Sequence, residues 1–388
     1  MAFKLLASTS AARSDMDIFH CDHCGQLVFF ENTQCMQCGH RLAYLPETGQ
    51  MGSLESLADG LWHSPAPDRA PTEYRLCANY TAYDVCNWAV CASDGNPLCL
   101  SCRLTRVIPD LDAAGHRQAW YRLEVAKRRL LYSLLKLRLP MADRQTDPSC
   151  GLAFELVEGP SSPHQPWVLT GHRDGVITIN VAEADDAERE RRRIALNEPF
   201  RTLLGHFRHE IGHYYWDRLM KDSDRLEAFR ALFGDERQDY AAALQAYYAN
   251  GPRQDWQLRF VSAYATMHPW EDWAETWAHY LHVTDAVETA AGCGISLQPR
   301  RTDEPNLTHV PIGAASPDAP FDRLMESWFP LTYVLNNLNR ALGLPDGYPF
   351  VLSAPAIEKM RFVHDTVRMA AASRPTSTDR EGSSVANG

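Results

Sequence analysis

The sequence lacks two features that would place the chain in a membrane or on a nucleic acid. No segment approaches the roughly 18 consecutive apolar residues that are needed to cross a bilayer, so we expect no transmembrane helix. Basic residues are outnumbered, with 38 Lys and Arg against 49 Asp and Glu, and the formal net charge is −11. Because phosphate binding requires a concentrated basic surface, this balance argues against a general nucleic-acid-binding protein.

The first residues also lack the apolar stretch of a secretory signal, because Lys4 interrupts a segment that is already short. We therefore expect a cytoplasmic protein, whose thiols stay reduced. The chain has eleven cysteines, and eight of them form two sets of four that include Cys-x-x-Cys pairs. In a reducing compartment, such spacing is typical of metal ligands rather than of a disulfide framework.

The first cysteine set is regular, with two Cys-x-x-Cys pairs that are each followed by glycine: Cys21 and Cys24, then Cys35 and Cys38. Paired knuckles of this kind bind one tetrahedral zinc ion, and glycine lets the backbone curl around the sulfur. A unit of about 28 residues cannot build an adequate core, so we expect the metal to supply most of its folding free energy. Three nearby histidines are alternative ligands that we interpret as bystanders: His20, His23 and His40.

The second cysteine set is less regular. Cys99 and Cys102 form a clear pair, whereas three residues compete for the two remaining positions: Cys77, Cys86 and Cys91. The spacing alone leaves this choice open.

Residues 209–213 read His-Glu-x-x-His. On an α-helix, positions i and i+4 lie on one face, so His209 and His213 can bind the same zinc ion. Glu210 is rotated by about 100° and is placed to take a proton from a water molecule whose pKa the zinc lowers to about 7. Downstream, Glu271 and Glu275 share another helical face. One of them can bind the metal, and the other can accept the second N–H of a zinc-bound histidine.

These acids carry a resemblance. A Glu-x-x-x-Glu segment downstream of His-Glu-x-x-His resembles the gluzincin clan, in which the first acid is the third ligand. The stretch from Tyr264 to Glu275 looks like that of lethal-factor-type gluzincins, in which a tyrosine seven residues before the ligand glutamate donates a hydrogen bond to the developing oxyanion. The resemblance therefore implies Glu271 as ligand, Glu275 as the partner of a histidine and Tyr264 as oxyanion donor.

Over residues 19–290, the chain resembles the zinc-binding metallopeptidases that carry an N-terminal zinc ribbon. The similarity lies in segments 19–25, 86–88, 102–111, 204–216 and 268–279. It implies an α+β fold in which zinc-ribbon modules precede a zincin-like (gluzincin) catalytic domain, mostly helical with a small sheet. It also favours Cys77 and Cys86 over Cys91 as ligands of the second Cys₄ site.

Patterns along the chain predict its organisation. Apolar residues recur at helical spacing over 117–139, and we interpret the many basic residues there as a solvated face. A strand is predicted at 175–181 after the turn signal at Asp174 and Gly175. Further helices are predicted at 202–220, 224–233, 236–249, 254–265 and 270–283. The expected segments are a leader (1–18), a zinc ribbon (19–46), a linker (47–72), a second Cys₄ module (73–110), a helical connector (111–149), the metallopeptidase domain (150–295), a Pro-rich loop (296–320), C-terminal helices (321–372) and a disordered tail (373–388).

Together these features predict a zinc metallopeptidase with one catalytic and two structural zinc ions. Its expected partner is a peptide or protein substrate, with no nucleic acid and no membrane. The alternative is a catalytically inert protein whose zinc ribbons recognise a protein or nucleic-acid partner. The intact Glu210 favours the enzyme, because a structural zinc site has no need of that carboxylate.

Overall fold

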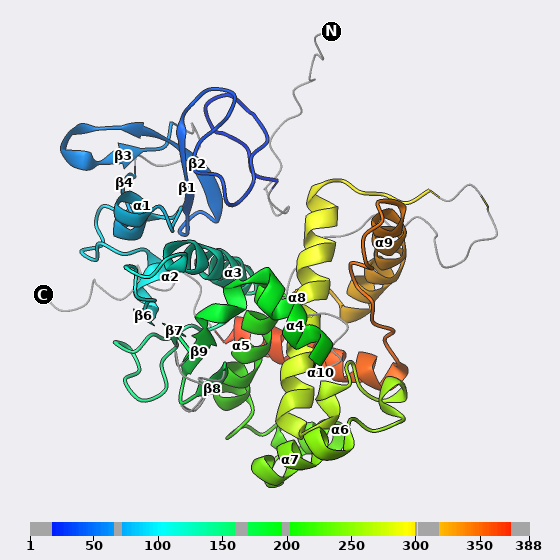
Figure 1. Cartoon of the computed structure of the whole chain (residues 1–388). Coiled ribbons are helices and arrows are strands. Elements are labelled where there is room, and N and C mark those ends of the chain that lie inside the picture. Colours follow the sequence, from blue (N-terminus) through cyan, green and yellow to red (C-terminus); the bar gives the residue numbers. More distant parts are fainter. Residues whose placement is uncertain are drawn as a thin grey trace, which may run out of the picture.

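The computed structural model describes residues 18–65, 72–159, 170–195, 202–298, 301 and 318–373 (Figure 1). The predicted leader and disordered tail lie almost wholly outside the described residues, and so does most of the Pro-rich segment 296–320. Among the helices that are described, none is long and apolar enough to cross a membrane.

Five antiparallel strands form a sheet in the N-terminal part of the chain, in the order β1-β2-β3-β4-β5. They span Arg41–Leu45, Gln50–Ser56, Trp62–His63, Glu73–Leu76 and Ala89–Cys91. The predicted linker at 47–72 is therefore wrong, because β2 and β3 lie inside it and join the two cysteine regions. The physical reason is a tight turn: Gly49 adopts φ +69° and donates its N–H to Leu45 O at 2.9 Å, so the chain folds back on β1.

Helix α3 (His116–Lys136) follows this sheet. Its predicted apolar face is confirmed by the buried leucines Leu123, Leu130, Leu131 and Leu134. The expectation of a solvated basic face is wrong for Lys127 and Arg128, which are buried. Buried Glu124 lies 2.8 Å from Lys127 Nζ and 3.9 Å from Arg128, and this pairing offsets part of the desolvation of both cations.

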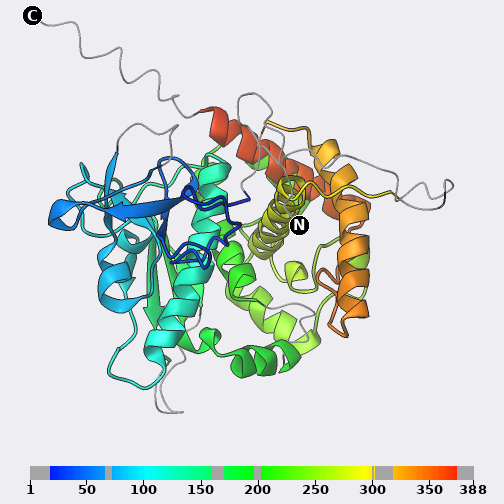
Figure 2. The same ribbon diagram turned by 90° about the horizontal axis from the view of Figure 1, so that it is seen from above.

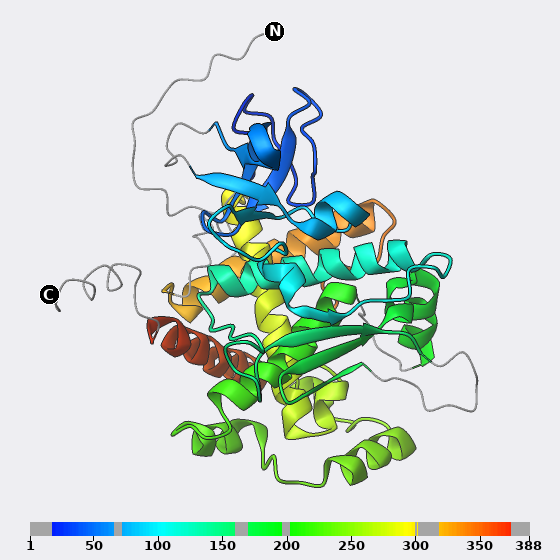
Figure 3. The ribbon, with the colours of Figure 1, turned by 90° about the vertical axis from the view of Figure 1, so that its left-hand side faces the viewer.

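A second sheet of four strands has the order β6-β7-β9-β8, and Figure 3 shows α3 running across one side of it. The strands are β6 (Thr105–Val107), β7 (Ala153–Val157), β8 (Gly171–Arg173) and β9 (Val176–Asn180). Neighbours β6, β7 and β9 are parallel, whereas β8 is antiparallel to β9. The strand predicted at 175–181 is confirmed as β9, and the turn before it has positive φ at both Asp174 and Gly175.

Helices make up most of the remaining described chain, and Figure 2 shows the later ones (yellow to red) gathered on the side opposite the first sheet (blue). The helices from α4 onward are α4 (Asp186–Ala195), α5 (Leu203–Leu219), α6 (Leu226–Phe233), α7 (Tyr240–Asn250), α8 (Pro269–Gly292), α9 (Phe321–Ala341) and α10 (Ala354–Ala372). The shorter elements are α1 (Ala78–Tyr83), α2 (Leu100–Arg103) and the 3₁₀ turns η1 (Ala58–Gly60), η2 (Val181–Ala184), η3 (Trp256–Leu258) and η4 (Tyr264–Thr266).

The predicted helix at 254–265 is wrong, because this region holds only the turns η3 and η4. Between them, Ser262 Oγ accepts the backbone N–H of Ala265 at 3.2 Å. A local side-chain bond of this kind competes with helical hydrogen bonding. The helices predicted at 202–220, 224–233, 236–249 and 270–283 are confirmed as α5, α6, α7 and α8, and α8 continues beyond its predicted end.

Helices α5 and α8 pack against each other, and Gly212 faces Ala274 and Trp277 of α8 in this contact. A Cβ at this position would lie 3.0 Å from Ala274 Cα and 3.1 Å from Trp277 Cβ. Trp273 Nε1 donates a hydrogen bond to Gly212 O at 2.9 Å, and this bond links the two helices. The glycine inside the His-Glu-x-x-His segment thus lets α8 approach α5, and this contact brings the acids of α8 to the histidines of α5.

Candidate active site and metal centres

Helix α5 presents the two histidines of the His-Glu-x-x-His segment on one face. Thr202 caps the helix, since its Oγ1 accepts the N–H of Gly205 at 3.0 Å. About two and three turns after this cap, His209 and His213 bring their Nε2 atoms to 3.2 Å from each other, as the i, i+4 spacing predicts. His209 is buried and His213 is half-buried.

Helix α8 supplies the two acids, which make different contacts. The carboxylate of Glu271 spans both imidazoles, with Oε2 2.9 Å from His209 Nε2 and Oε1 3.4 Å from His213 Nε2. Glu275 lies on the other side of His209, with Oε1 2.7 Å from Nδ1. The structure therefore brings donor atoms of His209, His213 and Glu271 within 4.8 Å of one another and places Glu275 behind His209.

These groups strongly perturb one another's pKa values. Burial lowers the pKa of His209, but hydrogen bonds to Glu271 and Glu275 outweigh it and leave that pKa well above its ordinary value. Burial raises the pKa of Glu271, but the charges and hydrogen bonds of the two histidines hold it well below normal. Glu275 shows the same competition, and its hydrogen bond to His209 lowers its pKa to about 2. Both carboxylates are thus anionic at neutral pH, which suits a bound cation.

The residues present fit a zinc ion. Two imidazole nitrogens and one carboxylate are a donor set that catalytic zinc sites use while keeping a position open. Glu210, next to His209 on α5, is buried, and its Oε2 has no hydrogen-bond partner within the described residues. An unpaired buried carboxylate oxygen is destabilising. It is suited to accept a hydrogen bond from a water molecule in the site.

Two residues that support the acids were not predicted. Tyr240, the first residue of α7, donates its hydroxyl to Glu271 Oε1 at 2.9 Å. Ser262, between η3 and η4, donates to Glu275 Oε2 at 2.6 Å. Neither residue lies in a recognisable motif, so no signal in the sequence marks them and only the fold reveals their place.

Tyr264, the predicted oxyanion donor, lies in η4 with its ring centroid 6.1 Å from that of His209. Burial, followed by the charge of Glu271, keeps its pKa well above the ordinary value. The phenol therefore keeps its proton at neutral pH and remains a hydrogen-bond donor. The structure thus places Tyr264 beside the histidines.

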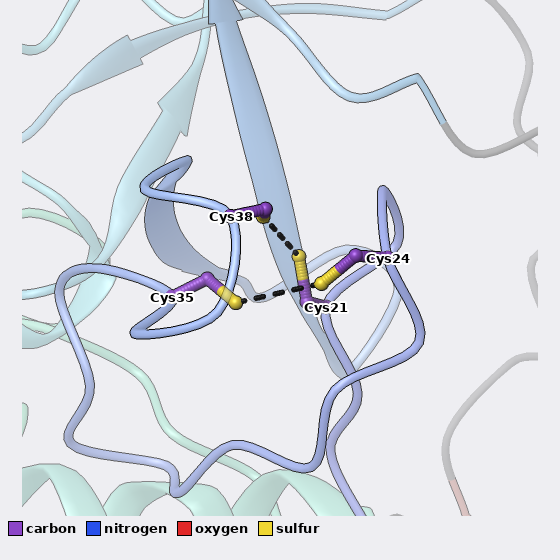
Figure 4. Close-up of side chains that lie close together, drawn as sticks. All are labelled: Cys21, Cys24, Cys35 and Cys38. Carbon is purple, nitrogen blue, oxygen red and sulfur yellow. Dashed lines mark hydrogen bonds between the residues drawn. The ribbon is translucent and has the colours of Figure 1, made fainter. Parts of the chain in front are cut away.

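The first cysteine set forms a compact group at the tips of two knuckles (Figure 4). The sulfurs of Cys21 and Cys38 lie 3.6 Å apart, and those of Cys24 and Cys35 lie 3.7 Å apart. In a tetrahedral site with zinc–sulfur bonds of about 2.3 Å, the sulfurs are about 3.8 Å apart, so these donors fit zinc. The glycine after each pair has φ +72° or +77° and donates its N–H to the carbonyl of the first cysteine of its knuckle, as predicted.

The second cysteine set is wholly buried and joins the four residues that the resemblance favoured: Cys77, Cys86, Cys99 and Cys102. The sulfurs of Cys86 and Cys99 lie 3.6 Å apart, and the N–H of Cys99 points to Cys77 Sγ at 3.4 Å. Cys91 does not join them, and its sulfur instead lies 3.0 Å from Ser93 Oγ. All eleven cysteines are described, and none forms a disulfide.

Comparison with known proteins matches this architecture. Residues 116–366 match the family described as "Putative zinc-binding metallo-peptidase". The chain belongs to this metallopeptidase family. Residues 18–113 match a zinc-ribbon domain. The zinc-ribbon match covers both cysteine sets, and the five-stranded sheet lies between the first set and the Cys99–Cys102 pair.

Relatives of this chain occur in mycobacteria. A protein of Mycobacterium tuberculosis and one of Mycobacterium bovis are each 46% identical to the chain over 351 residues, which cover 90% of the chain and 94% of the relative. Each is described only as an uncharacterized protein, so the similarity shows homology and gives no information about activity. No solved structure matches the chain. The fold is thus α+β, with a zinc ribbon before a metallopeptidase-like domain.

Proposed function

We propose that the protein is a zinc-dependent peptidase of the gluzincin type, with His209, His213 and Glu271 as ligands of the catalytic metal. The observation that carries this proposal is the buried, unpaired Oε2 of Glu210 beside the His–His–Glu group. A structural zinc site does not need such a carboxylate, whereas hydrolysis requires a base beside the attacking water.

A zinc ion held there would polarise the substrate carbonyl and lower the pKa of a water molecule to about 7. Glu210 takes a proton from that water as the water oxygen attacks the carbonyl carbon. Glu210 then delivers the proton to the amide nitrogen as the C–N bond breaks. Tyr264 donates its hydroxyl to the carbonyl oxygen, on which negative charge develops. Glu275 accepts the Nδ1–H of His209 and so keeps the lone pair of this imidazole on Nε2.

The substrate in this proposal is a peptide or an unfolded segment of a protein. In the order β6-β7-β9-β8 of the second sheet, strand β8 stands at one edge, and it packs against α5. An edge strand can hold an extended peptide by backbone hydrogen bonds. Two further zinc ions, one at each cysteine set, have a structural role in this proposal, which brings the total to three per chain.

The test compares new N-termini that the purified protein generates from a mixture of peptides and unfolded proteins. Glu210→Gln should reduce cleavage by at least about 100-fold, the usual contribution of a general base, while the zinc content stays the same. Asp217→Asn is the matched control, because Asp217 lies on the same helix outside the His–His–Glu group, and it should retain cleavage. Equal cleavage by wild type and Glu210→Gln would contradict the mechanism. A zinc-loaded wild type that cleaves nothing would favour the inert binding protein.

A further inference from the structure

A further group of side chains that could hold a metal ion lies beside the first cysteine set. Glu55 in β2 pairs with His63 of β3 in the antiparallel register. On its other side, Arg41 pairs with Leu54, so His40, one residue before β1, lies opposite Glu55. Directly opposed residues of antiparallel strands project to the same face of a sheet. The register therefore directs two imidazoles at one carboxylate.

The first knuckle adds a third histidine. His23 stacks on His40, with ring centroids 3.8 Å apart and planes inclined by 22°. Its neighbour Asp22 holds the knuckle against the sheet, because Asp22 Oδ2 accepts the N–H of Ser53 at 3.3 Å and the hydroxyl of Ser64 at 2.8 Å. The hydrogen bonds of Asp22 thus hold His23 at the cluster, in addition to the stacking of the His23 ring on His40.

The donor atoms are close to the spacing of a metal site. His23 Nδ1 and His40 Nε2 lie 4.0 and 3.7 Å from Oε1 of Glu55, and the three residues offer donor atoms within 4.8 Å of one another. In a tetrahedral zinc site with bonds of about 2.0–2.1 Å, neighbouring nitrogen and oxygen ligands lie about 3.3 Å apart, so only a small closure is needed. His63 Nε2 lies 3.4 Å from the other carboxylate oxygen, Oε2.

We propose that His23, His40 and Glu55 form an additional site for one divalent transition-metal cation of the zinc type. Two imidazoles and a carboxylate suit Zn²⁺ or Co²⁺, whereas Mg²⁺ and Ca²⁺ prefer all-oxygen sites. His63 is a positioning residue that orients the carboxylate from its second oxygen. The proposal is independent of the peptidase activity, because these residues lie on the zinc ribbon.

Exposure distinguishes this site from the cysteine sites. The side chains of His23, His40 and Glu55 are 46%, 23% and 40% exposed. Three protein ligands with solvent access leave a coordination position for water and a path for exchange. The occupancy of this site by a cation therefore follows the free concentration of that cation. A metal ion held by four thiolates binds far more tightly and stays bound. We therefore expect a site that fills and empties with zinc supply.

The test uses the full chain, equilibrated with Zn²⁺ that a chelator buffers first at a low and then at a roughly million-fold higher free concentration, and counts zinc per chain by mass spectrometry. When free zinc is raised, the wild type should gain one equivalent of zinc. The His23→Ala/His40→Ala double variant should not gain it. His20→Ala is the matched control, since His20 is exposed on the same knuckle next to Cys21, and it should gain this equivalent.

A graded series separates ligands from the positioning residue. His63→Ala should raise the Kd for the added zinc by about 10–100-fold, and His40→Ala should raise it further. Resistance of the cysteine thiols to alkylation shows that the ribbon stays folded in each variant. Equal zinc gain by wild type and the double variant would overturn the proposal, and so would an unchanged Kd in both His40→Ala and Glu55→Gln.

Discussion

The contacts of Glu271 and Glu275 make a graded prediction for binding of the catalytic zinc. Glu275→Ala removes a carboxylate that lies 2.7 Å from His209 Nδ1 and leaves the three proposed ligands in place. Loss of a partner behind a ligand weakens metal affinity by about 10–100-fold, or about 1.4–2.7 kcal/mol. Glu275→Gln keeps an oxygen that can accept the Nδ1–H and loses only the charge, so its effect should be smaller.

Glu271→Ala should have a much larger effect, because it removes the carboxylate that touches both histidines at 2.9 and 3.4 Å. Loss of a direct ligand should weaken affinity by more than about 1000-fold, or about 4 kcal/mol. Tyr240→Phe keeps all ligands but removes the hydroxyl that lies 2.9 Å from Glu271 Oε1. A hydrogen bond to a charged group contributes about 1.5–3 kcal/mol, so we expect a loss of about tenfold or more.

Competition with a chromophoric chelator measures these affinities on the full chain. Glu227→Ala serves as the control, because Glu227 is an exposed acid of α6 outside the site, and its affinity should equal that of the wild type. The reasoning is refuted if Glu275→Ala loses zinc as completely as Glu271→Ala does. A reversed order would make Glu275 the ligand. It would also remove the argument for Tyr264 as oxyanion donor, which rests on its seven-residue distance from Glu271.

The structure supports three other expected outcomes. Gly212→Ala should destabilise the zinc-loaded protein to urea by roughly 1 kcal/mol, because overpacking against Ala274 (about 1–3 kcal/mol) exceeds the gain in helix propensity (about 1 kcal/mol). Cys21→Ser should remove one zinc and lower the thermal midpoint of the chain less than Cys99→Ser does, because Cys99 belongs to the wholly buried set. Metal analysis of gently purified wild type at low free zinc should approach three equivalents, and a value near one would contradict structural zinc at both cysteine sets.

Local geometry explains what could be predicted from the sequence. The i, i+4 spacing of His209 and His213 defines their relation within one helix, whatever surrounds that helix. The first cysteine set is equally local, since each knuckle closes on its own glycine. The linker prediction failed because β2 pairs with β1 and β3 pairs with β4, and both of these partners lie outside the segment. Composition shows Gly, Pro and Ser there, but it does not show where a strand finds its neighbour.

Other parts of the site depend on tertiary contacts that spacing does not encode. Tyr240 reaches Glu271 across 31 residues, and Ser262 reaches Glu275 from a region whose helical pattern was misleading. The choice between Glu271 and Glu275 is of the same kind. Both lie on one face of α8, and only the approach of α5 at Gly212 decides which carboxylate spans the two histidines.

The same dependence on tertiary contacts connects the zinc ribbon to the metallopeptidase half. Four thiolates around one Zn²⁺ would carry a net charge of about −2, which is strongly unfavourable in a buried site without a nearby cation. Helix α3 supplies that cation as Arg128, which is buried and donates to Val85 O at 2.7 Å, beside the second cysteine set. Burial lowers the pKa of Arg128, but the charges of Cys86 and Glu124 outweigh it and raise that pKa. A basic residue that looks solvated in the sequence therefore offsets part of the negative charge of the buried centre, so the second cysteine set and α3 stabilise each other.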